Sequence, residues 1–255
     1  MKFAIFLSCF ALLACLEHFY PRRLIVQAKT ARWGLHFFCL GIFQVFVIFL
    51  PALTSLEMAR FAMAHQIGLF HWLGLELGAM TAILGLVLLD LALYWHHWLF
   101  HRFQWLYRFH RVHHSDTALD LSSALRFHPL EMSLSLLYKA AVIVVFGIHP
   151  IIALSFDFLL MIMAMLNHVN WRWDPRFEAT LRHFIVTPDY HRVHHDRNSQ
   201  RLNLSFNLSV WDKIFKTYKP YVYEDDHKID LGLIEPLPSQ TVGDLLVQPW
   251  LEEKT

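Results

Sequence analysis

The sequence predicts an all-α protein, an integral membrane helical bundle with a cytoplasmic, histidine-rich cap. Three observations lead there: an excess of apolar residues in long runs, an alternation of positive charge between the loops joining those runs, and a clustering of histidines. Of the 255 residues, 56% are hydrophobic and 17% are charged. An ordinary soluble domain has about 45–50% apolar and about 25% charged residues. The clustered excess therefore indicates a membrane protein.

A membrane-spanning helix needs about 20 mainly apolar residues, and five segments approach that requirement. The second and third are long enough, whereas the first and the last two are short and are expected to be tilted, interfacial or half-spanning. His149-Pro150 separates the last two, which indicates a tight helical hairpin. In chain order the segments are 3–16, 35–56, 73–95, 132–148 and 151–166.

Positive charge in short loops predicts orientation, because such charge favours the cytoplasmic side. Arg60 is the one basic residue after the second segment, whereas basic residues cluster after the first and third. The histidine-rich segments and the tail from Trp171 onward are thus expected on the cytoplasmic side. The clustered residues are Arg22, Arg23, Lys29, Arg32, Arg102, Arg108, Arg111 and Arg126.

The N-terminus fits two interpretations. Lys2 followed by an apolar run resembles a signal peptide, and residues 12–15 loosely resemble a lipoprotein cleavage site. Cleavage would leave the first basic segment outside, against the charge bias. An uncleaved anchor helix is therefore favoured.

Charged residues and cysteines exclude several classes of function. A net charge of +1 gives no electrostatic basis for nucleic-acid binding. The three cysteines have no CxxC spacing, which argues against a disulfide framework and a thiolate zinc site.

Lys139 and Asp157 are charged residues inside predicted spans, where charge is costly. They lie at similar depth in the predicted hairpin and are expected to pair.

The first histidine cluster follows the third apolar segment. Residues at i, i+4, i+7 and i+11 share one face of a helix, so Asp90, Tyr94, His97 and His101 form one stripe. Two imidazoles one turn apart can bind one metal ion. Asp90 and Tyr94 are the candidate catalytic residues, expected to orient or tune the histidine ligands.

Two further clusters share the spelling H-R-V-H-H. On a helix, the first histidine of each faces one of the last two, a turn further on. With the first cluster they supply eight imidazoles, which exceeds the needs of one metal ion and suggests two. Imidazole suits zinc, copper, iron and nickel, and the clusters lack the carboxylates of soluble di-iron bundles. The added candidate ligands are His110, His113, His114, His191, His194 and His195.

The remaining histidines are expected outside this metal-binding cap. His96 points about 100° away from His97 on a helix. The others lack ligand spacing and are interpreted as structural: His18, His36, His65, His71, His149, His183 and His227.

The three boxes resemble those of the fatty acid hydroxylase/sterol desaturase superfamily of membrane di-iron enzymes. The similarity runs from Asp90 to about Tyr218 and includes the stretches 126–131, 167–170, 187–188 and 211–218. The resemblance implies that His128 and His168 can join the ligands, although His128 can instead position the first turn of the next helix. Trp98 and the residues after Asn203 depart from the family pattern, which puts the shape of the substrate entrance in doubt.

The resemblance implies a domain plan and an activity. Membrane anchor helices are expected at 1–72, a fatty acid hydroxylase-like catalytic region at 73–220, and a cytoplasmic tail at 221–255. The activity implied is O2-dependent hydroxylation or desaturation of a lipid, such as a sterol or a fatty acyl chain, at two iron ions. No flavin, haem or dinucleotide motif appears, so an external cytochrome, ferredoxin or reductase is expected to supply electrons.

Three alternatives stay open from the sequence. The nearest is an oxygenase acting on a carotenoid or an alkylglycerol ether, since the ligand set does not encode substrate shape. A second is a membrane metal-binding or transport protein without oxygenase activity, for which ionisable residues along a mid-membrane path would be expected. A third is a scaffold that retains the fold, although a broken histidine box would be typical of that class.

Overall fold

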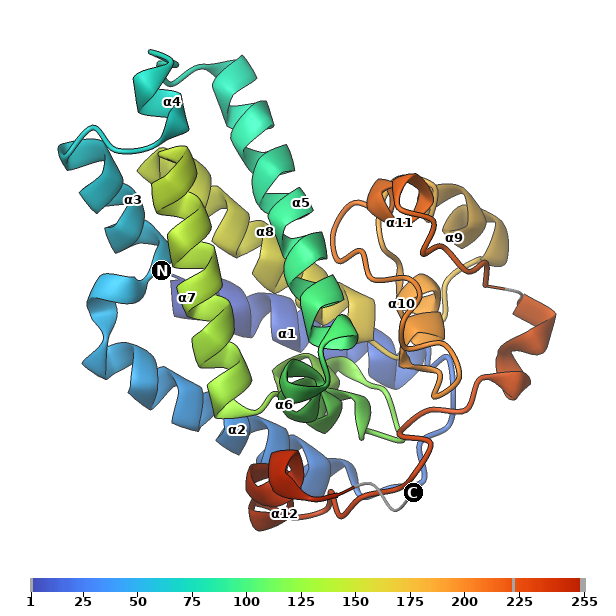
Figure 1. The fold of residues 1–255 in the computed structure, drawn as a ribbon. Coiled ribbons are helices and arrows are strands. Elements are labelled where there is room, and N and C mark those ends of the chain that lie inside the picture. The colour runs from blue at the N-terminus through green and yellow to red at the C-terminus, as the bar shows by residue number, and fades with distance from the viewer. Residues whose placement is uncertain (1, 222, 253–255) are drawn as a thin grey trace.

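The computed structural model describes residues 2–221 and 223–252, and there the chain forms helices, with isolated β-bridges and no strand (Figure 1). This confirms the all-α prediction. The helices are α1 (Lys2–Phe19), α2 (Lys29–Phe49), α3 (Ser55–Ala64), α4 (Leu69–Trp72), α5 (Ala79–Arg102), α6 (Gln104–His114), α7 (Pro129–Phe146), α8 (Pro150–His168), α9 (Pro175–Leu181), α10 (Pro188–His195), α11 (Val210–Ile214) and α12 (Val242–Val247), with short 3₁₀ turns at Pro51–Leu53, Leu121–Leu125, Tyr223–Lys228 and Gln248–Trp250.

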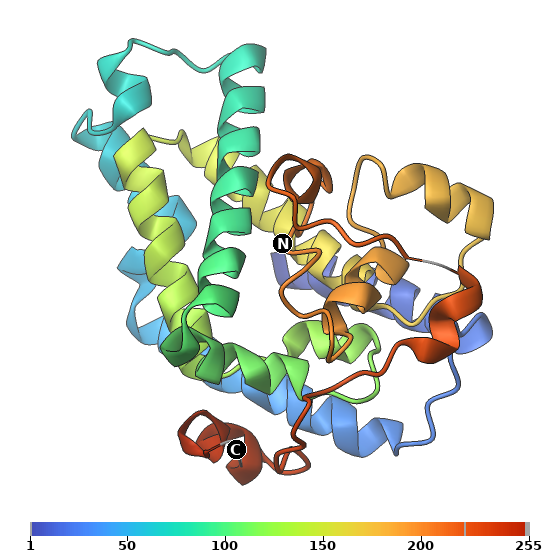
Figure 2. The same ribbon diagram turned by 45° about the vertical axis from the view of Figure 1, so that its right-hand side comes forward.

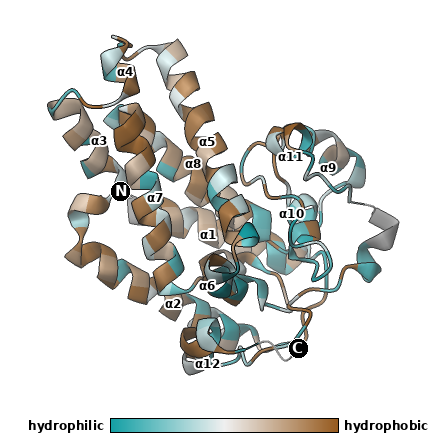
Figure 3. Ribbon diagram, in the orientation of Figure 1, coloured by the Kyte–Doolittle hydropathy of each residue, from teal (hydrophilic) through white to brown (hydrophobic). Residues whose placement is uncertain are grey.

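Four of these helices, α2, α5, α7 and α8, are long and apolar enough to cross a membrane. Hydrophobic residues predominate along these helices, whereas α6 and α10 are mostly hydrophilic (Figure 3). The chain is thus a multi-pass membrane protein. The predicted short fourth and fifth segments are helices of 18 and 19 residues, so both reach spanning length. The apolar stretch Ala4–Phe19 of α1 is shorter than these four.

The observed ends of two spans differ from those predicted. The second helix, α2, runs over 29–49 rather than 35–56, because Pro51 disfavours helical geometry in the residue before it. Thr54 then caps α3, its side chain accepting from the Glu57 amide. The third, α5, begins at Ala79 rather than at residue 73, after Gly74 with φ +65° and Gly78. It continues to Arg102 and so carries the first histidine box.

The predicted hairpin between α7 and α8 is present, but its arms diverge (Figures 1 and 2). Gly147 ends α7 in a left-handed conformation, and the His149 side chain caps α8. The short helix α3, which the sequence did not reveal, packs against both arms. Its Ala59 and Ala62 are fully buried, and such small residues let helix backbones approach closely.

The two charged residues inside spans pair as predicted. Lys139 Nζ lies 2.7 Å from Asp157 Oδ1, and Ser55 donates to the same oxygen at 2.9 Å. Replacing one member leaves the other charge unpaired in apolar surroundings, which costs stability. Replacing both with apolar residues removes that cost.

We expect Asp157→Ala to lose about 3 kcal/mol of unfolding free energy. The double variant Lys139→Met/Asp157→Leu should be restored to near the wild-type value. Thermal unfolding in detergent measures both. A single variant as stable as wild type would show that the pair does not matter to the fold.

The polar end of the molecule is built from α6, α10 and the chain that follows each. Helix α6 leaves the end of α5 at a sharp angle (Figure 2). Phe103 is the one residue between them, at the C-terminal end of α5 and the N-terminal end of α6. The C-terminal segment returns to this region, where the buried Arg111 guanidinium donates to the carbonyls of Gln248 and Leu251. The end of α5 with α6, the region of α10, and the C-terminal segment are distant in sequence but thus meet around the histidine boxes.

Candidate metal centre

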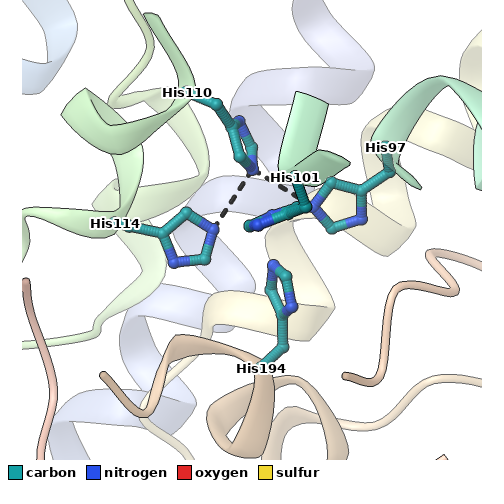
Figure 4. Close-up of side chains that lie close together, drawn as sticks. All are labelled: His97, His101, His110, His114 and His194. Carbon is teal, nitrogen blue, oxygen red and sulfur yellow. Dashed lines mark hydrogen bonds between the residues drawn. The ribbon is translucent and has the colours of Figure 1, made fainter. Parts of the chain in front are cut away.

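Nine buried histidines form two groups at the polar end, each compact enough to hold a metal ion. Within each group the candidate ligand nitrogens lie within 4.8 Å of one another, and no ring is more than 6% exposed. Figure 4 shows the rings of the larger group pointing toward one centre from α5, α6 and α10. The larger group is His97, His101, His110, His114 and His194, and the smaller is His113, His168, His191 and His195.

Both H-R-V-H-H boxes are helical, as predicted, and each divides its histidines between the two groups. His110 and His114 face the larger group, while His113 between them faces the smaller. In the third box the division is reversed: His191 and His195 face the smaller group, and His194 faces the larger. The reason is helical geometry: residues four apart share a face, whereas consecutive residues point about 100° apart.

The two groups are neighbours rather than separate sites. The ring centroids of His114 and His195, which belong to different groups, lie 4.6 Å apart, and those of His110 and His113, also from different groups, lie 5.5 Å apart. His168, at the end of α8, lies in the smaller group, with its Nε2 3.1 Å from Nε2 of His113. The structure thus brings His168 together with three box histidines, and its role as a ligand stays a prediction.

His128 is not among these nine histidines. Its Nδ1 accepts from the Leu130 amide, so its side chain caps α7. The opposite ring nitrogen lies 3.3 Å from the Leu246 carbonyl. The structure therefore gives His128 the alternative role, that of positioning the first turn of the following helix.

Hydrogen bonds to Nδ1 orient five of the nine rings. Four of these rings donate to backbone carbonyls: His97 to Leu204 at 2.7 Å, His113 to Arg126, His168 to Ala164 and His194 to Leu202. A proton on Nδ1 leaves the lone pair of Nε2 free to bind a metal ion, and ligating histidines are commonly held in this way.

The fifth ring has a carboxylate partner. His110 Nδ1 lies 2.5 Å from Glu131 Oε1, and both side chains are buried. Glu131 is a contributor that the sequence analysis missed, although it belongs to the stretch 126–131 that resembles the family. A signal was available, since a carboxylate in the first turn of a helix next to a predicted ligand box can reach an imidazole. The analysis had given the orienting role to Asp90 instead.

The arrangement of nitrogens fits a pair of metal ions. Six contacts between Nε2 atoms measure 3.1–3.2 Å, and adjacent ligands about 2.1 Å from one metal ion lie about 3 Å apart. Nε2 of the fully buried His194 has no hydrogen-bond partner among the described residues, whereas its Nδ1 donates to Leu202. A buried ring nitrogen without a partner, in a group whose other Nε2 atoms converge, is readily explained as a metal ligand.

Burial keeps the imidazoles neutral, as metal ligation requires. Burial lowers the pKa of His110 to about 3. For His114 and His195, burial and then the neighbouring imidazoles hold the pKa well below its ordinary value. At neutral pH these rings therefore offer lone pairs rather than charge.

Asp90 and Tyr94 lie on the predicted face of α5 but bond to a loop rather than to a histidine. The Asp90 carboxylate accepts from Asn207 at 2.8 Å and from the Trp211 indole at 2.7 Å. The Tyr94 hydroxyl lies 2.9 Å from the Thr217 hydroxyl. These contacts fix the segment 203–217, which in turn supplies the carbonyl that orients His97.

Asp212 is the centre of that segment; the sequence analysis gave it no role, although it belongs to the stretch 211–218 that resembles the family. Its buried carboxylate accepts from the amides of Leu204 and Ser205 at 2.7 and 2.8 Å, and from the hydroxyls of Tyr190 and Thr217 at 2.7 and 2.6 Å. Burial and then the adjacent Asp212 raise the pKa of Tyr190, which keeps this hydroxyl a donor.

Replacing Asp212 by alanine should destabilise the protein by about 3–5 kcal/mol. Several buried donors would lose their acceptor, and Leu204 would no longer present its carbonyl to His97. Chemical unfolding measures the loss. Asp230→Ala is the control, because its carboxylate is 61% exposed and pairs with Arg197, a surface pair worth at most about 1 kcal/mol. Equal effects of the two changes would contradict the account.

The histidines predicted to be structural also lie outside both groups. His96 packs on the rings of Phe100 and Tyr138. His36 is buried 2.8 Å from the Ser122 hydroxyl and 3.2 Å from the Arg126 guanidinium.

Comparison with known proteins points the same way. Residues 82–217, slightly more than half of the chain, match the fatty acid hydroxylase family. An alkylglycerol monooxygenase of Danio rerio is 28% identical over 195 residues, covering 72% of this chain and 41% of that protein. The ornithine lipid hydroxylase OlsE of Rhizobium tropici is 28% identical (65% and 50% covered), and the cholesterol 25-hydroxylase of Homo sapiens is 28% identical (52% and 49%).

The chain thus spans half or less of the length of these three relatives. No solved structure matches it significantly.

Proposed function

The chain belongs to the fatty acid hydroxylase family, and on this premise we propose that it is a membrane oxidoreductase that uses O2 to hydroxylate a lipid. Desaturation of the lipid is the variant outcome of the same chemistry. The observation that carries the proposal is the pair of adjacent imidazole groups, buried at the ends of membrane-length helices.

The two groups are proposed to hold two iron ions. His97, His101, His110, His114 and His194 would ligate one, and His113, His168, His191 and His195 the other. When bound, an iron pair would pass electrons from the external donor to O2 and supply the oxidising power needed to attack an inert C–H bond. Zinc fits imidazole equally well, but it has no redox chemistry and cannot support an oxygenase.

The chain's own residues give this centre its position and its dry surroundings. His97 and His101 lie in the last turns of α5, and His168 is the last residue of α8. A centre at the ends of two spans lies near the headgroup boundary, where a lipid chain can reach it from the bilayer. Burial of all nine rings excludes bulk water, which protects an oxidising centre from side reactions.

The substrate is proposed to be an amphiphilic lipid. The relatives are named for alkylglycerols, ornithine lipids and cholesterol, which share a polar head and a long apolar part. An alkylglycerol ether is the second candidate, favoured over a carotenoid because several relatives carry that name. The histidine side is proposed to be cytoplasmic from the charge bias, and an external protein is proposed to donate electrons.

Transport of a metal ion is a weaker proposal. It calls for ionisable residues along a path through the membrane, whereas Lys139 and Asp157 neutralise each other within the spans. All nine clustered imidazoles instead lie at one end of the helices.

Oxygen incorporation is the test of the proposal. Membranes that contain the protein, a reductant system and ¹⁸O₂ are incubated, and the lipids are analysed by mass spectrometry. A lipid that gains one ¹⁸O atom supports hydroxylation, and one that loses two hydrogens supports desaturation. If iron-loaded protein changes no lipid but moves metal ions across a vesicle membrane, transport is the better account.

A further inference from the structure

Three exposed arginines lie next in the chain to residues that contact one another beside the metal centre. Arg102 ends α5, Arg108 lies on α6, and Arg201 lies in the loop after α10. No ion pair involves any of them within the described chain. Trp105, 61% exposed, lies on α6 between the first two. We call these four residues the arginine patch.

The half-buried Tyr107, which lies between Trp105 and Arg108 in the chain, connects this patch to the histidines. The Tyr107 ring lies 5.7 Å from the ring of His101, measured between centroids, and its hydroxyl donates to the Gln200 side chain. That hydrogen bond joins α6 to the loop after α10. It therefore brings the backbone of Arg108, next to Tyr107, close to that of Arg201, next to Gln200.

We propose that the arginine patch is the docking surface for an acidic one-electron carrier protein, with Tyr107 between that carrier and His101. The proposal rests on the proposed function, because hydroxylation consumes more electrons than the lipid provides. One O2, two electrons and two protons convert a C–H bond into C–OH and release one water. The carrier delivers the two electrons in successive encounters, and the protons come from solvent.

The chemistry of the patch fits such a partner. Unpaired positive charge steers an acidic protein to this face and raises the rate of encounter. Arginine, tyrosine and tryptophan are the residues enriched at protein interfaces. Electron-transfer complexes are small and short-lived, so a patch of a few residues suffices. Electron transfer also weakens steeply with distance, which favours the face where a half-buried aromatic ring contacts a proposed ligand.

Binding can be measured without turnover. The probe is a plant-type ferredoxin, an acidic iron–sulfur protein, titrated against the detergent-purified protein at low and high ionic strength. The test variant is Arg102→Glu/Arg108→Glu/Arg201→Glu. The matched control, Arg172→Glu/Arg176→Glu/Lys213→Glu, changes the net charge equally at exposed residues in and beside α9 and α11, which lie away from α6 in Figure 1.

We expect salt-sensitive binding that weakens by at least about tenfold in the test variant and by less than about threefold in the control. Equal weakening in both, or no binding by the wild-type protein at low salt, would overturn the proposal. So would a test variant that keeps ferredoxin binding and loses only its attachment to anionic vesicles, since the patch would then bind lipid headgroups.

A second measurement separates this proposal from the proposed function. Iron-loaded wild type and test variant are reduced with dithionite and exposed to O2 for a single turnover. Equal product in both, with weakened ferredoxin binding in the variant, supports both proposals. Product in both with unchanged ferredoxin binding refutes the docking surface alone, and no product from the wild type refutes the oxygenase.

Discussion

Replacing His113 or His194 by alanine should abolish lipid oxidation and lower the bound iron from two ions per chain toward one. Each histidine lies beside two others in its box but belongs to the opposite group. Loss of a residue that merely orients a ligand already costs about 10–100-fold in affinity or activity, so loss of a ligand should cost at least about a hundredfold. Iron analysis and product formation by the same preparations measure the effect.

His96→Ala is the matched control for this prediction. His96 precedes His97 on the same helix but packs on Phe100 and Tyr138 instead of entering either group. Its replacement should leave iron content unchanged. Full iron content and normal turnover in both the His113 and His194 variants would refute the ligand assignment.

The second large effect is expected at Glu131. Replacing this residue by alanine removes the partner of His110 Nδ1 and leaves the ring free to rotate or to change tautomer. Affinity for one of the two metal ions, or activity, should fall by about 10–100-fold. Glu131→Gln keeps an oxygen that can accept from Nδ1 and should restore part of the loss.

Metal titration resolves this prediction better than activity alone, because only the larger group contains His110. One binding step should weaken while the other persists. The control is Ser133→Ala. Ser133 lies two residues after Glu131 on α7, and its hydroxyl donates to the Pro129 carbonyl. Equal weakening of both steps would show that Glu131 acts on the fold rather than on His110.

Much of this fold could be predicted because membrane helices and histidine boxes leave strong local signals. Apolar runs revealed the spans, and the turn at His149-Pro150 revealed the hairpin. The pairing of Lys139 with Asp157 followed from their depth. The ends of the spans were less accurate, since capping by Thr54 and the backbone at Gly74 decide them locally.

The division of the boxes was not predictable from spacing alone. Helical geometry shows that His113 and His114 diverge, but it does not show which distant histidine each will meet. That choice depends on how α6, α8 and α10 pack together. The supporting carboxylates were missed for the same reason, because Glu131 and Asp212 bond to residues distant from any helix face that the sequence defines. The stripe on one helix face suggested that Asp90 orients a nearby histidine, whereas its carboxylate accepts from Asn207.

The central claim is that two adjacent groups of imidazoles hold two iron ions, and X-ray absorption on protein purified with its native metal tests it most directly. The account predicts two irons per chain, a first coordination sphere dominated by imidazole nitrogen, and a second iron close to the first. A single ion per chain, a non-redox metal such as zinc at full occupancy, or a sphere dominated by carboxylate or sulfur would contradict it.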